Sequence, residues 1–303
     1  MEAEARPKTI VVATDFSEDA GAAVAWAEHI ARQHQARLVL AHASVPTMPP
    51  APEFVIVPPE YFAELHAIAR KRLDGAAADL RKGGLVADSE LVVGPAVTGI
   101  LEVAERQHAD LLVIGTRGRT GWRRMLLGST AARVVRDARC PVVTVHPTDA
   151  GPPRPIRTVL VPTDFSEDAT RAAEVAARAL VTEGPRRLVL VHAFRLPIET
   201  EHLPARMLID AIQAAEHTAR AQIEALAAKL ERPGLTIESF SREGYPVDVL
   251  LEHARVVRPD LIAMGTHGRS GLDRLFLGST TERVLPSAPC PVLTVRRDDD
   301  DDL

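Results

Sequence analysis

Residues 115–130, with the sequence GTRGRTGWRRMLLGST, return at 265–280 as GTHGRSGLDRLFLGST. An apolar run leads directly into each copy, LLVI at 111–114 and LIAM at 261–264. Two glycines three positions apart open each stretch, nine residues follow, and Gly-Ser-Thr closes it ahead of a helix-compatible segment. The pattern predicts a strand, a glycine-bounded loop and a helix N-terminus, present twice in one chain.

The chemistry of this stretch suits an anion. Glycine lets the backbone approach a ligand closely, and a helix start offers free N–H groups and a partial positive charge. Serine is a favoured N-cap residue, so Ser129 and Ser279 are predicted to cap the two helices. We therefore predict a phosphate-binding loop in each copy, although an ordinary loop that needs glycines for its turns remains the alternative. The glycines predicted to line the loops are Gly115, Gly118 and Gly128 in the first copy and Gly265, Gly268 and Gly278 in the second.

The repeat extends well beyond these loops. Gly115 and Gly265 are 150 positions apart, and Asp15 and Asp164 are 149 apart. A period of this length indicates a duplicated domain and is too long for a solenoid unit. The predicted organisation is a first domain over 1–148, a proline-rich linker over 149–156, a second domain over 157–297 and an acidic disordered tail over 298–303.

Apolar runs alternate with segments of helical periodicity inside each domain. Strands are predicted in the first domain at 8–14, 37–43, 88–94, 110–115 and 141–145, and the second repeats their order. Such alternation implies parallel pairing with right-handed crossovers, and strands that are apolar throughout imply a sheet covered on both faces. The predicted fold is α/β, with two tandem doubly wound, Rossmann-like domains that each contain a five-stranded, mainly parallel sheet.

Ligands of such sheets bind outside the carboxyl ends of the strands, at the point where the strand order reverses. Asp15 follows the first predicted strand, and the glycine loop follows the fourth. If these two strands are neighbours, the aspartate and the loop meet in one crevice.

Composition excludes several classes of protein. The chain has 303 residues, of which 46% are hydrophobic and 25% charged, as in ordinary globular proteins. No apolar run reaches the ~18 residues that span a membrane, and the N-terminus lacks a signal-peptide core, so a cytoplasmic location without membrane contact is expected. The net charge of −5 equals the charge of Asp298–Asp302 alone, and without a basic stripe no nucleic-acid partner is expected. Cys140 and Cys290 form neither a disulfide framework nor metal-binding spacing, so both are expected to be buried.

The pattern Gly-x2-Gly-x9-Gly-Ser after a strand resembles the signature of ATP-binding universal stress proteins. The sequence TDFSEDA at 14–20 and 163–169 and the endings CPVVTV and CPVLTV also look like that family, so the resemblance covers nearly the whole chain. It implies one adenine-nucleotide site in each domain, for ATP with or without Mg²⁺. The residues that the resemblance assigns to the two sites are Asp15, Ala43, Ile114, Gly115, Gly118, Gly128, Ser129 and Thr130, and Asp164, Ala193, Met264, Gly265, Gly268, Gly278, Ser279 and Thr280.

The resemblance also implies a role for each kind of residue. The aspartates would contact the adenosine part, the alanines would lie by the adenine, and the glycines, serines and threonines would hold ribose and phosphates. Two departures bear on this assignment. The family often has proline two residues before the aspartate, where Pro162 fits and Ala13 does not. It often has valine where Ala43 and Ala193 stand, which implies a roomier adenine pocket. Helix N-capping is the alternative role for both aspartates.

The expected function is an ATP-binding stress-response or regulatory module with little or no turnover. A P-loop lysine motif is absent, no general base with a partner is visible, and no catalytic or metal-binding residue is predicted. His42 and His192 are expected to be structural. The alternatives are a slow ATP hydrolase or phosphotransferase and a ligand-free interaction scaffold. In the family the last strand pairs domains, so PVVTV at 141–145 and PVLTV at 291–295 are expected to pair in an intramolecular pseudo-dimer, which leaves room for a homodimer of chains.

Overall fold

A computed structural model gives the structure of the protein. It describes residues 6–44, 59–116, 127–147, 155–178, 186–196, 204–268 and 277–296. The chain forms two compact units, the first made of Pro7–Arg124 and Gly128–Pro153 and the second built on Arg154–Leu303. Most of the predicted linker and the whole predicted acidic tail lie outside the described residues.

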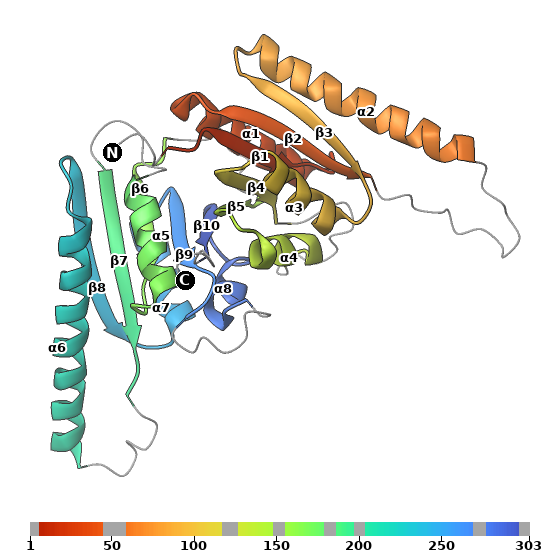
Figure 1. The fold of residues 1–303 in the computed structure, drawn as a ribbon. Coiled ribbons are helices and arrows are strands. Elements are labelled where there is room, and N and C mark those ends of the chain that lie inside the picture. Colours follow the sequence, from red (N-terminus) through yellow and green to blue (C-terminus); the bar gives the residue numbers. More distant parts are fainter. Residues whose placement is uncertain are drawn as a thin grey trace, which may run out of the picture. The chain divides into compact units, whose positions relative to one another are not determined.

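The first unit alternates strands and helices along the chain (Figure 1). Its elements are β1 (Thr9–Ala13), α1 (Glu18–His34), β2 (Arg37–Ser44), α2 (Pro59–Lys82), β3 (Ala87–Val93), α3 (Ala96–Arg106), β4 (Leu111–Gly115), α4 (Ser129–Asp137) and β5 (Val142–Val145). The strands lie in the order β3-β2-β1-β4-β5, and every neighbouring pair is parallel. Parallel strands need long crossover connections, which the helices provide.

The second unit repeats this plan (Figure 1). Its elements are β6 (Thr158–Pro162), α5 (Glu167–Arg178), β7 (Arg186–Phe194), α6 (Ala205–Leu230), β8 (Leu235–Glu243), α7 (Pro246–Val257), β9 (Leu261–Gly265), α8 (Ser279–Val284) and β10 (Val292–Val295). The strand order is β8-β7-β6-β9-β10, again with parallel neighbours throughout.

Helices cover both faces of each sheet. Right-handed crossovers place α1 and α2 on one face of the first sheet and α3 and α4 on the other, and α5 to α8 follow the same rule in the second unit (Figure 1). The central strands therefore have no solvent face, and Ile10, Val11 and Val12 of β1 are fully buried. This explains why these strands are apolar at every position. The two five-stranded parallel sheets confirm the predicted doubly wound α/β fold.

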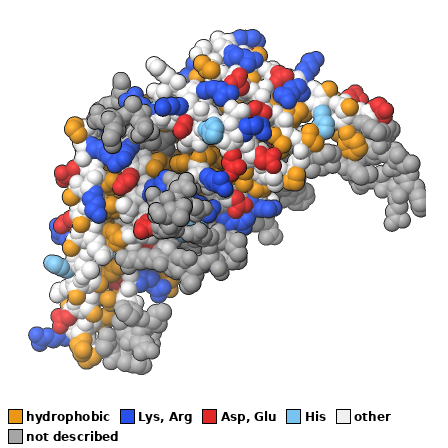
Figure 2. Space-filling model, in the orientation of Figure 1, with side chains coloured by type: hydrophobic (Ala, Val, Ile, Leu, Met, Phe, Trp, Pro, Cys, Tyr) orange, Lys and Arg blue, Asp and Glu red, His pale blue; other side chains and the backbone are white. Residues whose placement is uncertain are grey.

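The long helices α2 and α6 pack on the edge strands β3 and β8 only along part of their length. Leu73 of α2 and Ile223 of α6 are buried at equivalent positions of the two repeats. The first half of α6 instead exposes Met207 and Ile209, by 56% and 53%. Figure 2 shows hydrophobic side chains among charged ones on the surface of this helix.

None of the described helices is both long and apolar enough to cross a bilayer.

Candidate functional site

The strand order brings the predicted site residues to one edge of each sheet. β1 and β4 are direct neighbours, with Val12 opposite Val113, and β6 and β9 are neighbours, with Leu160 opposite Ile262. The order of the strands reverses between these pairs, so the condition set by the sequence is met in both units. Asp15 and the end of β4 therefore lie at the same carboxyl edge, where doubly wound sheets bind ligands.

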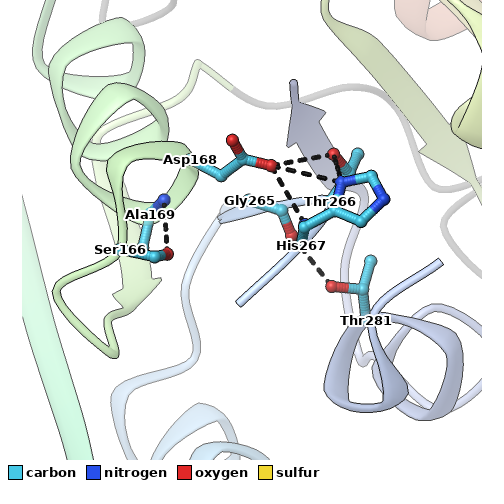
Figure 3. Close-up of polar contacts among 7 residues, drawn as sticks. All are labelled: Ser166, Asp168, Ala169, Gly265, Thr266, His267 and Thr281. Atoms are coloured by element: carbon cyan, nitrogen blue, oxygen red, sulfur yellow. Dashed lines mark hydrogen bonds and ion pairs between the residues drawn. The ribbon is translucent and has the colours of Figure 1, made fainter. Parts of the chain in front are cut away.

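Each aspartate is fixed by a tight turn ahead of a helix. Asp15 Oδ1 accepts a hydrogen bond from the backbone N–H of Ser17 at 3.0 Å, and Asp164 Oδ1 accepts one from Ser166 at 3.0 Å. The serines then cap the helices. Ser17 Oγ accepts from the N–H of Ala20 at 3.2 Å, and Ser166 Oγ accepts from that of Ala169 at 3.3 Å (Figure 3). The alternative that the aspartates themselves are the N-caps is therefore wrong.

The turn after each aspartate contains a phenylalanine in the left-handed region. Phe16 and Phe165 have φ of 63° and 64°, which bulky residues rarely adopt and which costs about 1–3 kcal/mol. Their rings lie 4.7 and 4.4 Å from those of His42 and His192.

His42 and His192 also hold this turn from the neighbouring strand. The Nδ1 of His42 donates to the carbonyl of Thr14, and that of His192 to the carbonyl of Thr163, both at 2.7 Å. These contacts agree with the structural role that was expected for the two histidines. They set the direction of the turn that carries the aspartate.

Gly115 and Gly265 serve helix packing. A Cβ on Gly115 would lie 3.0 Å from the carbonyl oxygen of Asp19, and one on Gly265 would lie 2.8 Å from the carbonyl carbon of Asp168. The first turns of α1 and α5 thus leave no space for a side chain at these two positions. Gly118 lies outside the described residues.

Gly268 is the described glycine that lies against a predicted ligand contact. A Cβ at this position would lie 2.7 Å from Oδ2 of Asp164. The carboxylate and the glycine loop of the second unit are therefore in direct contact, as expected for two parts of one site.

One hydrogen bond closes each glycine loop. The N–H of Gly128 donates to the carbonyl of Thr116, and that of Gly278 to the carbonyl of Thr266, both at 2.8 Å. Gly128 and Gly278 are also the N-cap residues of α4 and α8, so the prediction that Ser129 and Ser279 are the caps is wrong. The reason is steric, because a Cβ on Gly278 would lie 2.9 Å from the Thr266 oxygen.

The remaining predicted residues line the same edge with different exposure. Ser129 and Ser279 are the exposed first residues of their helices, and Thr130 and Thr280 are half-buried. Ile114 and Met264 are buried at the ends of β4 and β9. Ala43 and Ala193 are half-buried in β2 and β7.

The second unit carries a polar cluster that the sequence analysis missed (Figure 3). Asp168, in the first turn of α5, is only 8% exposed. Its Oδ2 accepts hydrogen bonds from Thr266 Oγ1 and from the backbone N–H of His267, each at 3.1 Å. Nδ1 of His267 lies 3.4 Å from the same oxygen and 3.0 Å from Thr266 Oγ1. Asp168 and His267 are 99 positions apart, so no local motif indicated the pair.

The first unit treats the equivalent threonine differently. Thr116 Oγ1 lies 3.1 Å from Nδ1 of His146, which follows β5, and both residues are buried. Position 146 corresponds to Arg296 in the second repeat, and His267 corresponds to Arg117 in the first. In the sequence, the two copies thus exchange a histidine and an arginine at these two positions.

Two depressions of the described surface are formed by other residues. One is formed by 231–237 at the end of α6, and the other by one side of α2 around Arg72. Neither contains a predicted site residue. We place the candidate site by the strand order and the contacts of Asp164, because residues 117–126 and 269–276 of the glycine loops are outside the described residues.

Comparison with known proteins gives consistent matches along the chain. The sequence profile of the Universal stress protein family matches residues 7–146 and again 155–296. A curated universal stress protein of Mycobacterium tuberculosis is 30% identical over 301 residues, which cover 95% of this chain and 97% of that protein. One from Thermus aquaticus is 36% identical over 142 residues, 46% of this chain and 98% of its own length.

Among solved structures, a universal stress protein from Archaeoglobus fulgidus superposes with a TM-score of 0.69 at 22% identity. The match covers 98% of this chain and 99% of that one. At this identity the likeness shows the fold.

Proposed function

The chain belongs to the universal stress protein family, and on this premise we propose that each domain binds an adenine nucleotide, ATP with or without Mg²⁺, as a stress-response or regulatory module. Turnover is expected to be slow or absent, and the proposed location is the cytoplasm. The observation that carries the proposal is the contact between Gly268 and Asp164 at the β6–β9 switch point.

The described groups fit the two ends of a nucleotide. When bound, the nucleotide supplies a ribose with hydroxyl donors and phosphates with negative charge. A carboxylate held by its turn, such as Asp15 or Asp164, is a fixed acceptor for hydroxyl or amino groups. The first N–H groups of α4, at Ser129 and Thr130, have no intrahelical partner and suit an anion.

A helix terminus is expected to contribute less to phosphate binding at the second site than at the first. α8 has only six residues, so its dipole is shorter than that of the nine-residue α4. Asp164, Gly268 and the side chains at the end of β9 are therefore the main supports of the second site. Ala43 and Ala193, which are half-buried, are the residues that we propose to lie beside the adenine.

The same family assignment supports a proposal about assembly. We propose that the segments 141–145 and 291–295 pair with each other, which gives an intramolecular pseudo-dimer, and that two chains can associate further. Short apolar strands left unpaired at a sheet edge would favour aggregation. Cross-linking of single cysteines placed in the two segments, in a chain without Cys140 and Cys290, tests the pairing.

G268A is the sharpest test of the nucleotide site. The added Cβ would displace the Asp164 carboxylate and leave backbone packing intact. We expect ATP affinity at the second site to fall at least about tenfold, or ~1.4 kcal/mol, with an unchanged melting temperature. G75A in α2 is the matched control, because a Cβ there meets nothing within 4 Å. Unaltered ATP affinity of G268A and of D164A would refute the proposed site.

A further inference from the structure

His267 has two ring nitrogens in different surroundings (Figure 3). Nδ1 faces two oxygens, Thr266 Oγ1 at 3.0 Å and Asp168 Oδ2 at 3.4 Å. The Thr266 hydroxyl donates its hydrogen to Asp168, so both oxygens present lone pairs to the ring. Nδ1 must therefore carry the hydrogen, and Nε2 of the neutral ring keeps a lone pair.

Nε2 of His267 is buried and has no hydrogen-bond partner among the described residues. Buried polar atoms in folded proteins nearly always have one, so such an atom calls for an explanation. Packing does not provide it, because Nδ1 and the backbone N–H already fix this residue to Asp168.

The position of His267 points to the proposed nucleotide site. It lies between Gly265, which closes β9, and Gly268, which lies against Asp164. Its Cα would be 3.5 Å from a Cβ on Gly278, the N-cap of α8. The backbone of His267 therefore belongs to the part of the loop that the proposed function assigns to the phosphates.

We propose that Nε2 of His267 is a phosphate contact of the second nucleotide site, with Asp168 and Thr266 as the residues that position the ring. This inference rests on the proposed nucleotide binding. A phosphate oxygen is an acceptor, so Nε2 takes up a proton from solvent, becomes a donor and bonds to the phosphate. The carboxylate of Asp168 balances the charge of the protonated ring.

The other charged groups around the ring come from neighbouring elements. Asp164 precedes α5 and reaches Gly268. Arg296 follows β10, whose Val295 accepts a hydrogen bond from the N–H of Thr266 at 3.0 Å. α8 contacts the end of β9 through Thr281, which donates to the carbonyl of Gly265 at 2.9 Å (Figure 3). Asp168 is the carboxylate in direct contact with the imidazole.

The first domain has a different residue at the same position of the sequence. Arg117 stands where the second repeat has His267, and arginine stays charged at every physiological pH. Nucleotide binding at the second site is thus expected to protonate His267, whereas binding at the first site should not change the charge of Arg117. The duplicated sites would differ in what controls their phosphate contact.

The experiment uses the full chain with ¹⁵N-labelled histidines. In the free protein His267 should show the tautomer with hydrogen on Nδ1, assigned by comparison with H267Q, and ATP should protonate Nε2. Calorimetry in two buffers of different ionisation enthalpy should show proton uptake that H267Q lacks and H217Q, on exposed α6, keeps. D168N should lose the fixed tautomer and most of the uptake, and H267Q should weaken ATP binding at this site about tenfold.

The possible failures are distinguishable. ATP binding with unchanged His267 nitrogens, or proton uptake that persists in H267Q, would overturn this inference and leave the proposed function standing. Absence of ATP binding to the wild-type chain would overturn both. If H267Q fails to fold, D168N decides instead: its own substitution should shift the nitrogens of His267, and proton uptake that persists undiminished in D168N would overturn the inference.

Discussion

Replacing Gly265 with alanine is expected to destabilise the second domain strongly, although the change adds one methyl group. The new Cβ would lie 2.7 Å from the Cβ of Asp168, 2.8 Å from its carbonyl carbon and 2.9 Å from the nitrogen of Ala169. Two of these three atoms belong to the backbone at the start of α5, so no side-chain rotation relieves the contact. The equivalent change at Gly115 is milder, because the nearest atoms are 3.0, 3.1 and 3.4 Å away.

The distances set the expected size of the effect. Carbon atoms pack best at ≈ 3.5–4.0 Å, so the first turn of α5 must move by about 0.7 Å in G265A and by roughly half of that in G115A. Overpacking costs about 1–3 kcal/mol, and we assign about 3 to G265A and about 1 to G115A. For domains of this size 1 kcal/mol corresponds to about 2–4 °C in melting temperature. The melting temperature should thus fall by about 6–12 °C in G265A and by about 2–4 °C in G115A.

The chain offers a direct readout for each domain. Both tryptophans, Trp26 and Trp122, belong to the first domain, so their fluorescence follows that domain while circular dichroism follows both. G265A should lower the dichroism transition and leave the fluorescence transition close to wild type. G75A should gain about 1 kcal/mol, because alanine is the better helix former and its Cβ meets open space. The reasoning is refuted if G265A has the same melting temperature as G75A, or if G115A is less stable than G265A.

Three further predictions concern binding and chemistry. The charged residues of 115–130 sum to +4 and those of 265–280 to +1, so the first domain is expected to prefer ATP over AMP more strongly. D164A leaves only the first site intact and D15A only the second. Titration of both chains should give the higher ratio of ATP affinity to AMP affinity for D164A. ATP turnover should stay far below the ~1–10³ s⁻¹ of typical enzymes, and a rate in that range that is lost in D164A would contradict the binding module. Cys290 is buried as expected, whereas Cys140 is only half-buried. This partial burial raises the pKa of the Cys140 thiol to about 12, so in a C290A chain alkylation at pH 8 should be slower than after unfolding. The folded state holds the thiol proton of Cys140 more tightly than the unfolded state does. This proton therefore contributes fully to the free energy of unfolding below the unfolded pKa of 9.0, and the contribution is lost as the pH rises toward 12. C140A should not show this loss of stability between pH 9 and 12.

The sheets could be predicted from the sequence because periodicity and burial are tied together. Strands such as Leu111–Gly115 are buried at every position, and uninterrupted apolar runs followed by helical periodicity are typical of strands covered on both faces. The same reasoning anticipated that the aspartate and the glycine loop meet, as Asp164 and Gly268 do in the second unit, since right-handed crossovers fix the edge at which both emerge. Because the sequence repeats after 150 residues, each element predicted in the first domain was also predicted in the second.

The details of the site could not be predicted because they depend on contacts between distant residues. The glycine spacing is visible in the sequence, but only the packing of α1 and α5 shows that Gly115 and Gly265 accommodate a helix. Serine is a better cap than glycine on average, yet the loop closure at Gly278 leaves no space for a Cβ. The Asp168–His267 pair joins two elements 99 residues apart, and only the sheet brings them together.

The two domains share the contacts that determine the path of the backbone around the candidate site. In both, a phenylalanine at positive φ, a histidine bonded to a threonine carbonyl and a glycine bonded to the loop carbonyl recur with nearly equal geometry. Each of these contacts fixes the chain direction, so a change at any of them would move the aspartate or the loop.

The positions that differ carry charge instead. Arg72 lies over the Phe16 ring at 4.4 Å, whereas the equivalent residue of the second repeat is Gln222. His146 corresponds to Arg296, and Arg117 to His267. These exchanges change which of the two repeats has an arginine at each position. A duplicated scaffold can therefore give the two proposed nucleotide sites a different character, and the proton uptake expected at His267 is the measurable form of that difference.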